Sequence, residues 1–170
     1  MASSRIYALL ALLLLAEAAA LHAKTTPNLV SILTRRKKYG TLLKLLKTTN
    51  LVTAVEDQLK NNPDGITLFA PTDAAFGKLP PGALANLTLA QATYILQLHA
   101  LPEFYSFGNL RKVKKPIETF AEGSSLKVTL SRKKVFISSG PVTTPLKKSL
   151  YKKFPLSLFT IGDVLIPNVK

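Results

Sequence analysis

The side chains of this chain that could do chemistry are mostly positively charged. The 170 residues include 23 Lys and Arg against 9 Asp and Glu, which gives a formal net charge of +14 at pH 7. Most of the basic residues stand in four clusters: Arg35, Arg36, Lys37 and Lys38; Arg111, Lys112, Lys114 and Lys115; Arg132, Lys133 and Lys134; Lys147, Lys148, Lys152 and Lys153. The summed field of so many like charges attracts polyanions.

Two interpretations of these clusters stay open. A single cluster is typical of a solvated loop that keeps a protein soluble. Four clusters with few acidic residues favour a surface that binds an acidic polysaccharide, and salt should weaken that binding because surface charges are screened beyond about 8–10 Å. An anionic membrane surface is a less favoured partner, since no predicted helix pairs a Lys- or Arg-rich face with a Trp- or Phe-rich one.

Catalytic and metal-binding groups are scarce. The chain has no cysteine and two histidines, and only His99 lies outside a segment that we expect to be removed. No nucleophile-elbow, zinc-protease, dinucleotide-binding or phosphate-loop motif occurs. A glycosidase needs two facing carboxylates, but Asp57, Glu103, Glu118 and Asp163 fall in separate segments. We therefore expect a protein that is not an enzyme and that binds no cofactor or metal.

The first 23 residues predict a secretory signal peptide. Arg5 supplies a short positive region, residues 8–16 are an unbroken apolar run, and small residues lead to an expected cleavage after Ala23. The apolar run is shorter than the ~20 residues of a membrane span, and Glu17 follows it, so we expect no transmembrane segment. Export from the cell also argues against nucleic acid as a partner.

The rest of the chain predicts one domain, residues 24–170, with a core at about 27–167. The sequence ends at Lys170 without the small-residue site, polar spacer and apolar tail of a lipid-anchor signal, so no lipid anchor is expected.

Periodicity then predicts the elements of this domain. Apolar residues at helical spacing predict helices over 29–33, 42–46, 52–59 and 88–99. Strand patterns occur at 117–120, 126–130, 135–137, 158–161 and 164–166, with a hairpin turn at 131–134 and an extended segment at 103–107. A helical first half followed by a strand-rich second half indicates an α+β fold.

The stretch from Thr67 to Phe76 predicts the corner around which these elements are organised. Its first three residues favour a buried strand, and Pro71 ends that strand because proline has no N–H to donate. Thr72 can cap a short helix with its hydroxyl, and Asp73 lies in the first turn, where a negative charge suits the helix dipole. The small residues before Phe76 offer an apolar surface on which this turn can dock.

Three ordered motifs resemble the signature boxes of the fasciclin-type domain. They are residues 67–76, with Phe-Ala-Pro-Thr-Asp; residues 94–102, similar to the Tyr-His box; and residues 163–167, similar to the closing Val-Leu-hydrophobic-Pro box. The signature residues are Phe69, Pro71, Thr72, Asp73, Phe76, His99, Val164, Leu165 and Pro167. The resemblance implies a single fasciclin-like domain, built as a β-sheet wedge or sandwich with helices packed along its edge.

The chain looks most like the plant fasciclin-like arabinogalactan proteins. This resemblance implies a secreted adhesion or binding module of the extracellular matrix, in the cell wall or apoplast. We expect its partners to be an acidic cell-wall polysaccharide such as pectin, or an extracellular protein, contacted through the basic clusters. The alternatives are binding to an anionic membrane surface and, less favoured, a wall-modifying enzyme. Only two Thr-Pro pairs occur, so heavy arabinogalactan decoration is not expected.

Three polar side chains have specific expectations. The family's Tyr-His box has been tied to partner contact, but a histidine near a helix C-terminus can also bond the last carbonyls, and for His99 we favour this structural role. For Asp73 we favour stabilisation of its own helix over contact with a ligand. Asn86 begins the only N-glycosylation sequon, which predicts an exposed glycosylated loop. The following Thr88 forms a predicted capping box with Gln91.

Overall fold

The structure is a computed structural model that describes residues 26–167. The predicted signal peptide and the predicted lack of a lipid anchor at the C-terminus concern residues outside this range. The helices are α2 (Leu29–Thr34), α3 (Gly40–Thr48), α4 (Leu51–Asn61), α5 (Asp73–Phe76), α6 (Leu89–Leu98) and α7 (Phe107–Leu110). The strands are β1 (Ile66–Pro71), β2 (Ala100–Leu101), β3 (Ile117–Glu118), β4 (Ser125–Ser131), β5 (Lys134–Ser138), β6 (Thr143–Lys153) and β7 (Leu156–Ile161).

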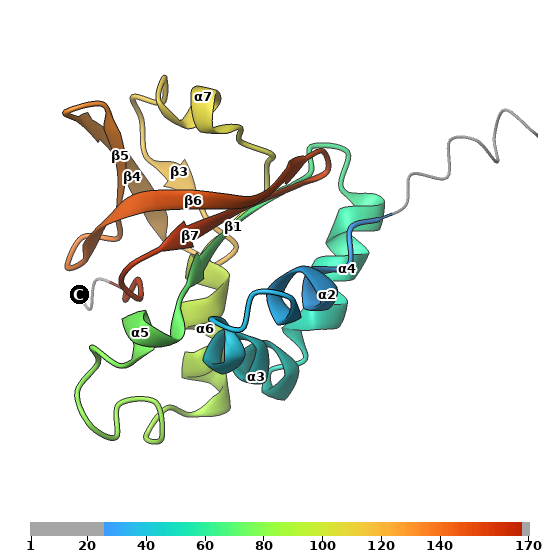
Figure 1. Cartoon of the computed structure of the whole chain (residues 1–170), viewed down its shortest axis with the longest axis vertical. Helices are drawn as coiled ribbons and strands as arrows, with labels where there is room; N and C mark the ends of the chain where they lie inside the picture. Colours follow the sequence, from blue (N-terminus) through green and yellow to red (C-terminus); the bar gives the residue numbers. More distant parts are fainter. Residues whose placement is uncertain (1–25, 168–170) are drawn as a thin grey trace, which may run out of the picture.

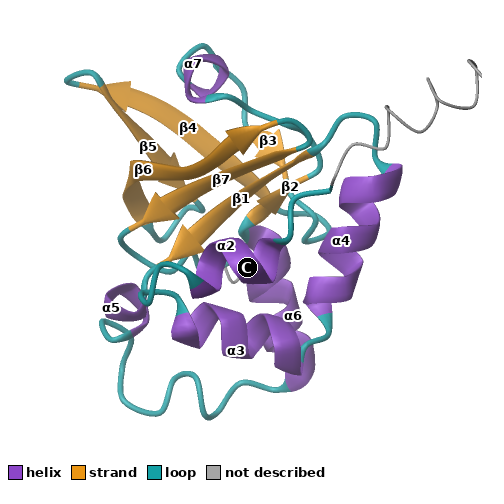
Figure 2. Ribbon diagram, turned by 45° about the vertical axis from the view of Figure 1, so that its right-hand side comes forward, coloured by secondary structure: helices purple, strands orange, loops and turns teal. Residues whose placement is uncertain are grey.

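The strands form one sheet in the order β2-β1-β7-β6-β5-β4-β3. The β1–β7 pair is parallel and every other pair is antiparallel. Helices α2, α3, α4 and α6 gather on one side of the β1–β7 end of the sheet, and α7 lies apart from them (Figures 1 and 2). The α+β prediction and the arrangement of a sheet with helices along its edge are confirmed.

Strands β1 and β7 are buried on both faces, and each contributes to two cores. The first core packs the sheet against α2, α3, α4 and α6, and receives Ile66, Ala70, Leu156 and Leu158 from these strands. The second core lies within the curled sheet, and receives Phe69, Phe159 and Ile161. The alternation follows the two-residue period of a strand. The rings of Phe69 and Phe159 stack with centroids 6.3 Å apart.

The predicted corner after β1 is confirmed. Thr72 is the N-cap of α5, and its hydroxyl accepts a hydrogen bond from the Ala75 N–H. Phe76 packs in the first core with 6% of its surface exposed. The predicted capping box of α6 is confirmed as well, because Thr88 and Gln91 each accept a bond from the other's backbone N–H.

Two predicted elements are wrong in whole or in part, and the prediction also omits a long strand. Residues 164–166 are not a strand, and β7 is the last strand along the chain. Residues 103–107 do not stay extended throughout, since α7 begins at Phe107 with Ser106 as its N-cap. The longest strand, β6, has no counterpart in the prediction. The register of β6 against β7 shifts between Leu146 and Ser149 and again before Tyr151, so its side chains do not keep a simple alternation.

Candidate functional site

Parts of two of the four basic clusters meet at one hollow on the surface. This hollow, of about 740 Å³, is lined on one side by Arg36, Lys37 and Lys38 and on another by Lys147 and Lys148. We call it the basic hollow. Its remaining lining residues are Tyr39, Thr72, Asp73, Ala74, Leu150 and Thr160. The corner after β1 therefore forms part of its wall.

Local backbone geometry positions both sets of basic side chains. Arg36, Lys37 and Lys38 occupy the tight connection between α2 and α3, where Lys37 has a left-handed φ of 45°. On the opposite side, Lys147 and Lys148 lie within the register shift of β6. A bulge of this kind bends a strand and changes the direction of its side chains.

Asp73 is the single carboxylate among the described residues that line the basic hollow. Its two oxygens accept hydrogen bonds from the backbone N–H groups of Gly40, at 3.2 Å, and Thr41, at 2.8 Å. The Thr41 backbone bond is the largest of the causes that lower the pKa of Asp73. Asp73 thus caps the neighbouring helix α3, whose N-cap residue Tyr39 makes no side-chain cap. The sequence predicts only that Asp73 stabilises its own helix, α5. It does not predict this contact with α3.

Among the described residues, the basic side chains of the hollow form no ion pair, although the charge of Lys147 acts on Asp163. Within residues 26–167 the ion pairs are Lys60–Asp57 and Lys78–Asp163. None of the five basic residues of the hollow takes part in either pair. Five basic groups against one carboxylate make the hollow a site that attracts anions.

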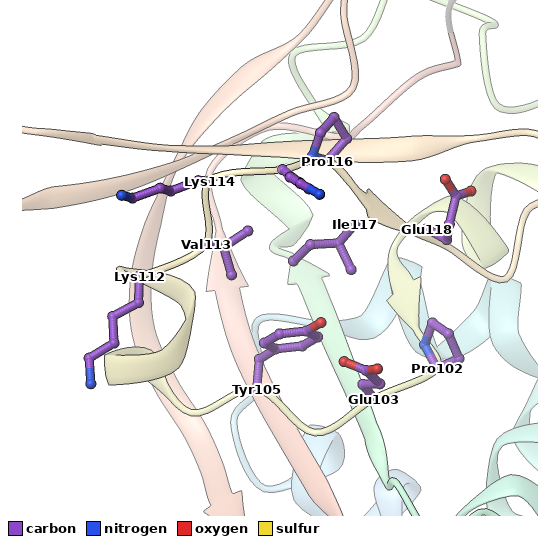
Figure 3. A pocket seen from close by; sticks show the side chains of 10 residues that line it. Pro102, Glu103, Tyr105, Lys112, Val113, Lys114, Pro116, Ile117 and Glu118 are labelled. Carbon is purple, nitrogen blue, oxygen red and sulfur yellow. The ribbon is translucent and has the colours of Figure 1, made fainter.

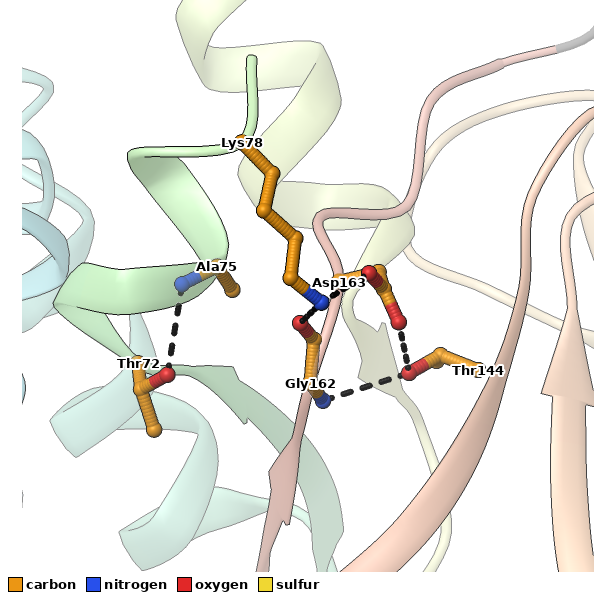
Figure 4. Close-up of polar contacts among 6 residues, drawn as sticks. All are labelled: Thr72, Ala75, Lys78, Thr144, Gly162 and Asp163. Atoms are coloured by element: carbon orange, nitrogen blue, oxygen red, sulfur yellow. Dashed lines mark hydrogen bonds and ion pairs between the residues drawn. The ribbon is translucent and has the colours of Figure 1, made fainter.

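A polar network fastens the corner to the end of β7 beside this hollow (Figure 4). The Lys78 Nζ donates to Asp163 Oδ1 at 2.6 Å and to the Gly162 carbonyl at 2.8 Å. Thr144 donates its hydroxyl proton to Asp163 Oδ2 and accepts a bond from the Gly162 N–H. The Lys78 bond is the main cause that lowers the pKa of Asp163, and the charge of Lys147 contributes. This network fixes the position of the corner relative to β6.

The other basic residues lie elsewhere on the surface. Lys112, Lys114 and Lys115 line a second hollow of about 500 Å³, together with Glu103 and Glu118 (Figure 3). The sequence contains no local pattern that would place these two carboxylates in one hollow. Arg132 and Lys133 form the two-residue turn of the β4–β5 hairpin, with left-handed φ values of 46° and 64°, and Lys134 begins β5. Arg111 follows α7, and Lys152 and Lys153 end β6.

His99 is buried, with 3% of its surface exposed. The Leu165 N–H donates to its Nε2 at 3.0 Å, so Nε2 is unprotonated and Nδ1 carries the proton that is donated to the Ile95 carbonyl at 2.7 Å. Burial lowers the pKa of His99 to about 4, against a smaller opposing effect of the Ile95 carbonyl. His99 therefore joins α6 to the C-terminal segment, and contact with a partner would require this bond network to open.

The remaining signature residues pack inside the protein. Phe69, Pro71, Val164 and Leu165 are buried, and Pro167 is half-buried. Their placement indicates a packing role for this part of the signature. Asn86 is exposed in the connection between α5 and α6, where the sequon prediction needs it to be.

Two further features concern the part of the chain that the structure describes. No group of three or more His, Cys, Asp or Glu side chains there could hold a metal ion. No helix between residues 26 and 167 is long and apolar enough to cross a membrane.

Comparison with known proteins extends these observations. Fasciclin-like arabinogalactan protein 6 of Arabidopsis thaliana is 36% identical over 152 residues, which are 85% of this chain and 62% of that protein. Fasciclin-like arabinogalactan protein 12 of the same plant is 32% identical over 146 residues, 83% of this chain and 59% of that protein. The chain thus spans about six tenths of the length of these relatives.

A solved structure has the same fold. It is a FAS1 domain pair from the insect cell adhesion molecule Fasciclin I, with a TM-score of 0.59 and 14% identity, and the match covers 74% of this chain and 44% of that chain. Residues 37–167 match the description of the Fasciclin domain. On the strength of this match and of the plant relatives, the chain belongs to the fasciclin domain family.

Proposed function

We propose that this protein is a secreted adhesion module of the plant cell wall, and that its basic hollow binds an acidic polysaccharide such as pectate. The named relatives support the extracellular setting, because arabinogalactan proteins and a cell adhesion molecule are among them. One observation supports an acidic ligand above all: five basic residues line one hollow, namely Arg36, Lys37, Lys38, Lys147 and Lys148. The function is binding, with no reaction catalysed.

The shape of the hollow favours a chain of carboxylates over a flat membrane. Its two basic walls come from separate elements, the α2–α3 connection and β6, and they surround a depression. A polyuronate can enter such a depression and meet both walls, whereas a flat lipid surface meets only the rim. Below the walls, the Tyr39 hydroxyl and the Thr160 hydroxyl bond each other at 2.7 Å and are buried. This bond holds the floor of the hollow in place.

Pectate binding by two matched triple variants tests the proposal. Arg36→Gln, Lys38→Gln and Lys148→Gln together should weaken binding to immobilised pectate by about tenfold or more, because they remove three charges from the hollow. Arg132→Gln, Lys133→Gln and Lys134→Gln remove the same charge from the distant hairpin, and should change binding by less than about threefold. Equal losses in the two variants would show that total charge, and no particular site, holds the polymer.

Further measurements distinguish pectate binding from the alternative functions. Raising the salt concentration from 0.05 to about 0.5 M should weaken pectate binding strongly, since it shortens the screening length to a few ångströms. Binding that stays constant across this series would contradict the electrostatic basis. Tighter binding to phosphatidylserine vesicles than to pectate would favour the membrane alternative, and release of shortened uronate products would favour an enzyme.

A further inference from the structure

The second hollow differs in chemistry from the basic hollow. Its floor and roof are apolar, since the ring of Tyr105 lies across the hollow from Val113 and Ile117 (Figure 3). Charges of both signs surround this apolar interior. Glu103 and Glu118 supply two exposed carboxylates, and lysines including Lys115 supply the ammonium groups. We call this feature the Tyr105 hollow.

The Tyr105 side of the hollow is held rigidly by the signature strand β1. The buried hydroxyl of Thr67 donates to the Glu103 carbonyl and accepts from the Tyr105 N–H, both at 2.7 Å. The Phe104 N–H between them donates to the Asp64 carbonyl at 2.8 Å. These bonds fix the backbone of three consecutive residues, 103–105, which lowers the entropy cost of binding a ligand there.

Tyr105 presents an aromatic face beside a carboxylate. Burial and the adjacent Glu103 carboxylate raise the pKa of Tyr105 to about 12, so its hydroxyl stays protonated at neutral pH. The other wall is formed by residues 112–118, which lie after α7 and include β3. In β3, Ile117 and Glu118 pair with Leu126 and Ser125 of β4. Both walls are therefore anchored to the sheet.

From this arrangement we propose that the Tyr105 hollow binds neutral hexose oligosaccharides. A pyranose ring has an apolar C–H face that can stack on Tyr105, and hydroxyls that can donate to Glu103 and Glu118 and accept from Lys115. The volume of about 500 Å³ has room for more than one sugar ring. The site is independent of the proposed pectate function, and it would let one module hold two kinds of wall polymer.

The charges of the hollow argue against the nearest competing ligands. A polyuronate would meet two carboxylates beside three lysines in the Tyr105 hollow, whereas the basic hollow offers it five basic residues beside one carboxylate and is the more favourable site. A proline-rich peptide could stack on Tyr105, but proline has no N–H to donate to the two carboxylates. Sugar hydroxyls both donate and accept, so they satisfy both signs of charge around the hollow.

Calorimetric titration of the mature chain with cellohexaose, mannohexaose and galactohexaose tests this proposal. At least one of these probes should bind, and Tyr105→Ala should weaken its binding by about tenfold or more through loss of the stacking face. Tyr105→Phe keeps the ring and should cost less than about threefold, because only the hydroxyl contact is lost. Glu118→Gln, on the exposed rim, should cost about three- to tenfold through loss of a charged acceptor.

Control measurements make each result decisive. Thermal unfolding of every variant shows whether it is folded, and if Tyr105→Ala is not, Glu118→Gln and Tyr105→Phe decide in its place. The triple variant of the basic hollow should bind the neutral probes as the unaltered chain does, so failure of the pectate proposal would leave this one standing. No binding of any probe at ~10 mM, or unchanged binding in Tyr105→Ala and Glu118→Gln, would overturn the proposal.

Discussion

His99 shows how burial turns a titratable side chain into a structural one. Its imidazole joins the Ile95 carbonyl of α6 to the Leu165 N–H of the C-terminal segment, and only the neutral ring can make both bonds. A proton on Nε2 would break the bond to Leu165 and place a charge in the core. The histidine of the signature is thus best explained by the packing of the fold.

This geometry predicts a specific loss of stability in acid. The pKa of His99 falls from 6.5 to about 4 on folding, so between these values the unfolded chain binds a proton that the native protein excludes. Stability must therefore fall as the pH drops from about 6.5 to 4, by roughly 3 kcal/mol from this residue.

Urea unfolding at pH 7 and pH 4.5 measures this loss. His99→Gln removes the titrating group, so its stability should change less over this range than that of the unaltered chain. The other groups titrate alike in both proteins, and the comparison therefore isolates His99. The same pH dependence in both would rule out this account of the residue.

Asp73 is a second residue whose role depends on a contact distant in sequence. Its carboxylate receives the first N–H groups of α3, at Gly40 and Thr41, although it belongs to α5. Asp73→Ala should reduce the free energy of unfolding by about 1–2 kcal/mol, as loss of a helix N-cap does. Denaturant unfolding checks this, with exposed Asp57→Ala in α4 as control. A loss no larger than in the control would show that the long-range cap contributes nothing.

At the scale of elements, local sequence signals predict the corners and caps well. Thr72 and Thr88 act through neighbours a few residues away, so their roles are visible in the sequence. Strand β6 is different. Its residues include two Lys-Lys pairs, and its register shifts disrupt the alternation that identifies a strand. Its pairing with β5 on one side and β7 on the other makes it a strand.

The capping box of α6 gives an element-scale prediction. Thr88→Ala should lower the free energy of unfolding by about 1 kcal/mol, because the Gln91 N–H loses its acceptor. The protein should come from a bacterial host, since this change also removes the sequon at Asn86. Thr88→Ser preserves the cap and should stay within about 0.5 kcal/mol of the unaltered chain. Equal losses for Ala and Ser would disprove the capping role.

At the scale of the whole molecule, the fold sorts the charge into distinct surfaces. Helix α7, which precedes one wall of the Tyr105 hollow, lies at the opposite end of the molecule from α3 and α5, which border the basic hollow (Figures 1 and 2). The four clusters and the motifs of the fasciclin domain are visible in the sequence. Residues 36–38 and 147–148 line one hollow, and Glu103 and Glu118 line another. Both arrangements depend on sheet topology and could not be predicted from local patterns.

The most direct test of the central claim is an NMR titration of the isotope-labelled mature chain with trigalacturonate. The account predicts that backbone amides of residues 36–39 and of 147–150 shift together and follow one dissociation constant, while those of the 131–134 hairpin stay in place. Shifts of similar size at all four basic clusters, or different dissociation constants for the two walls, would contradict the claim that the two segments form one binding site.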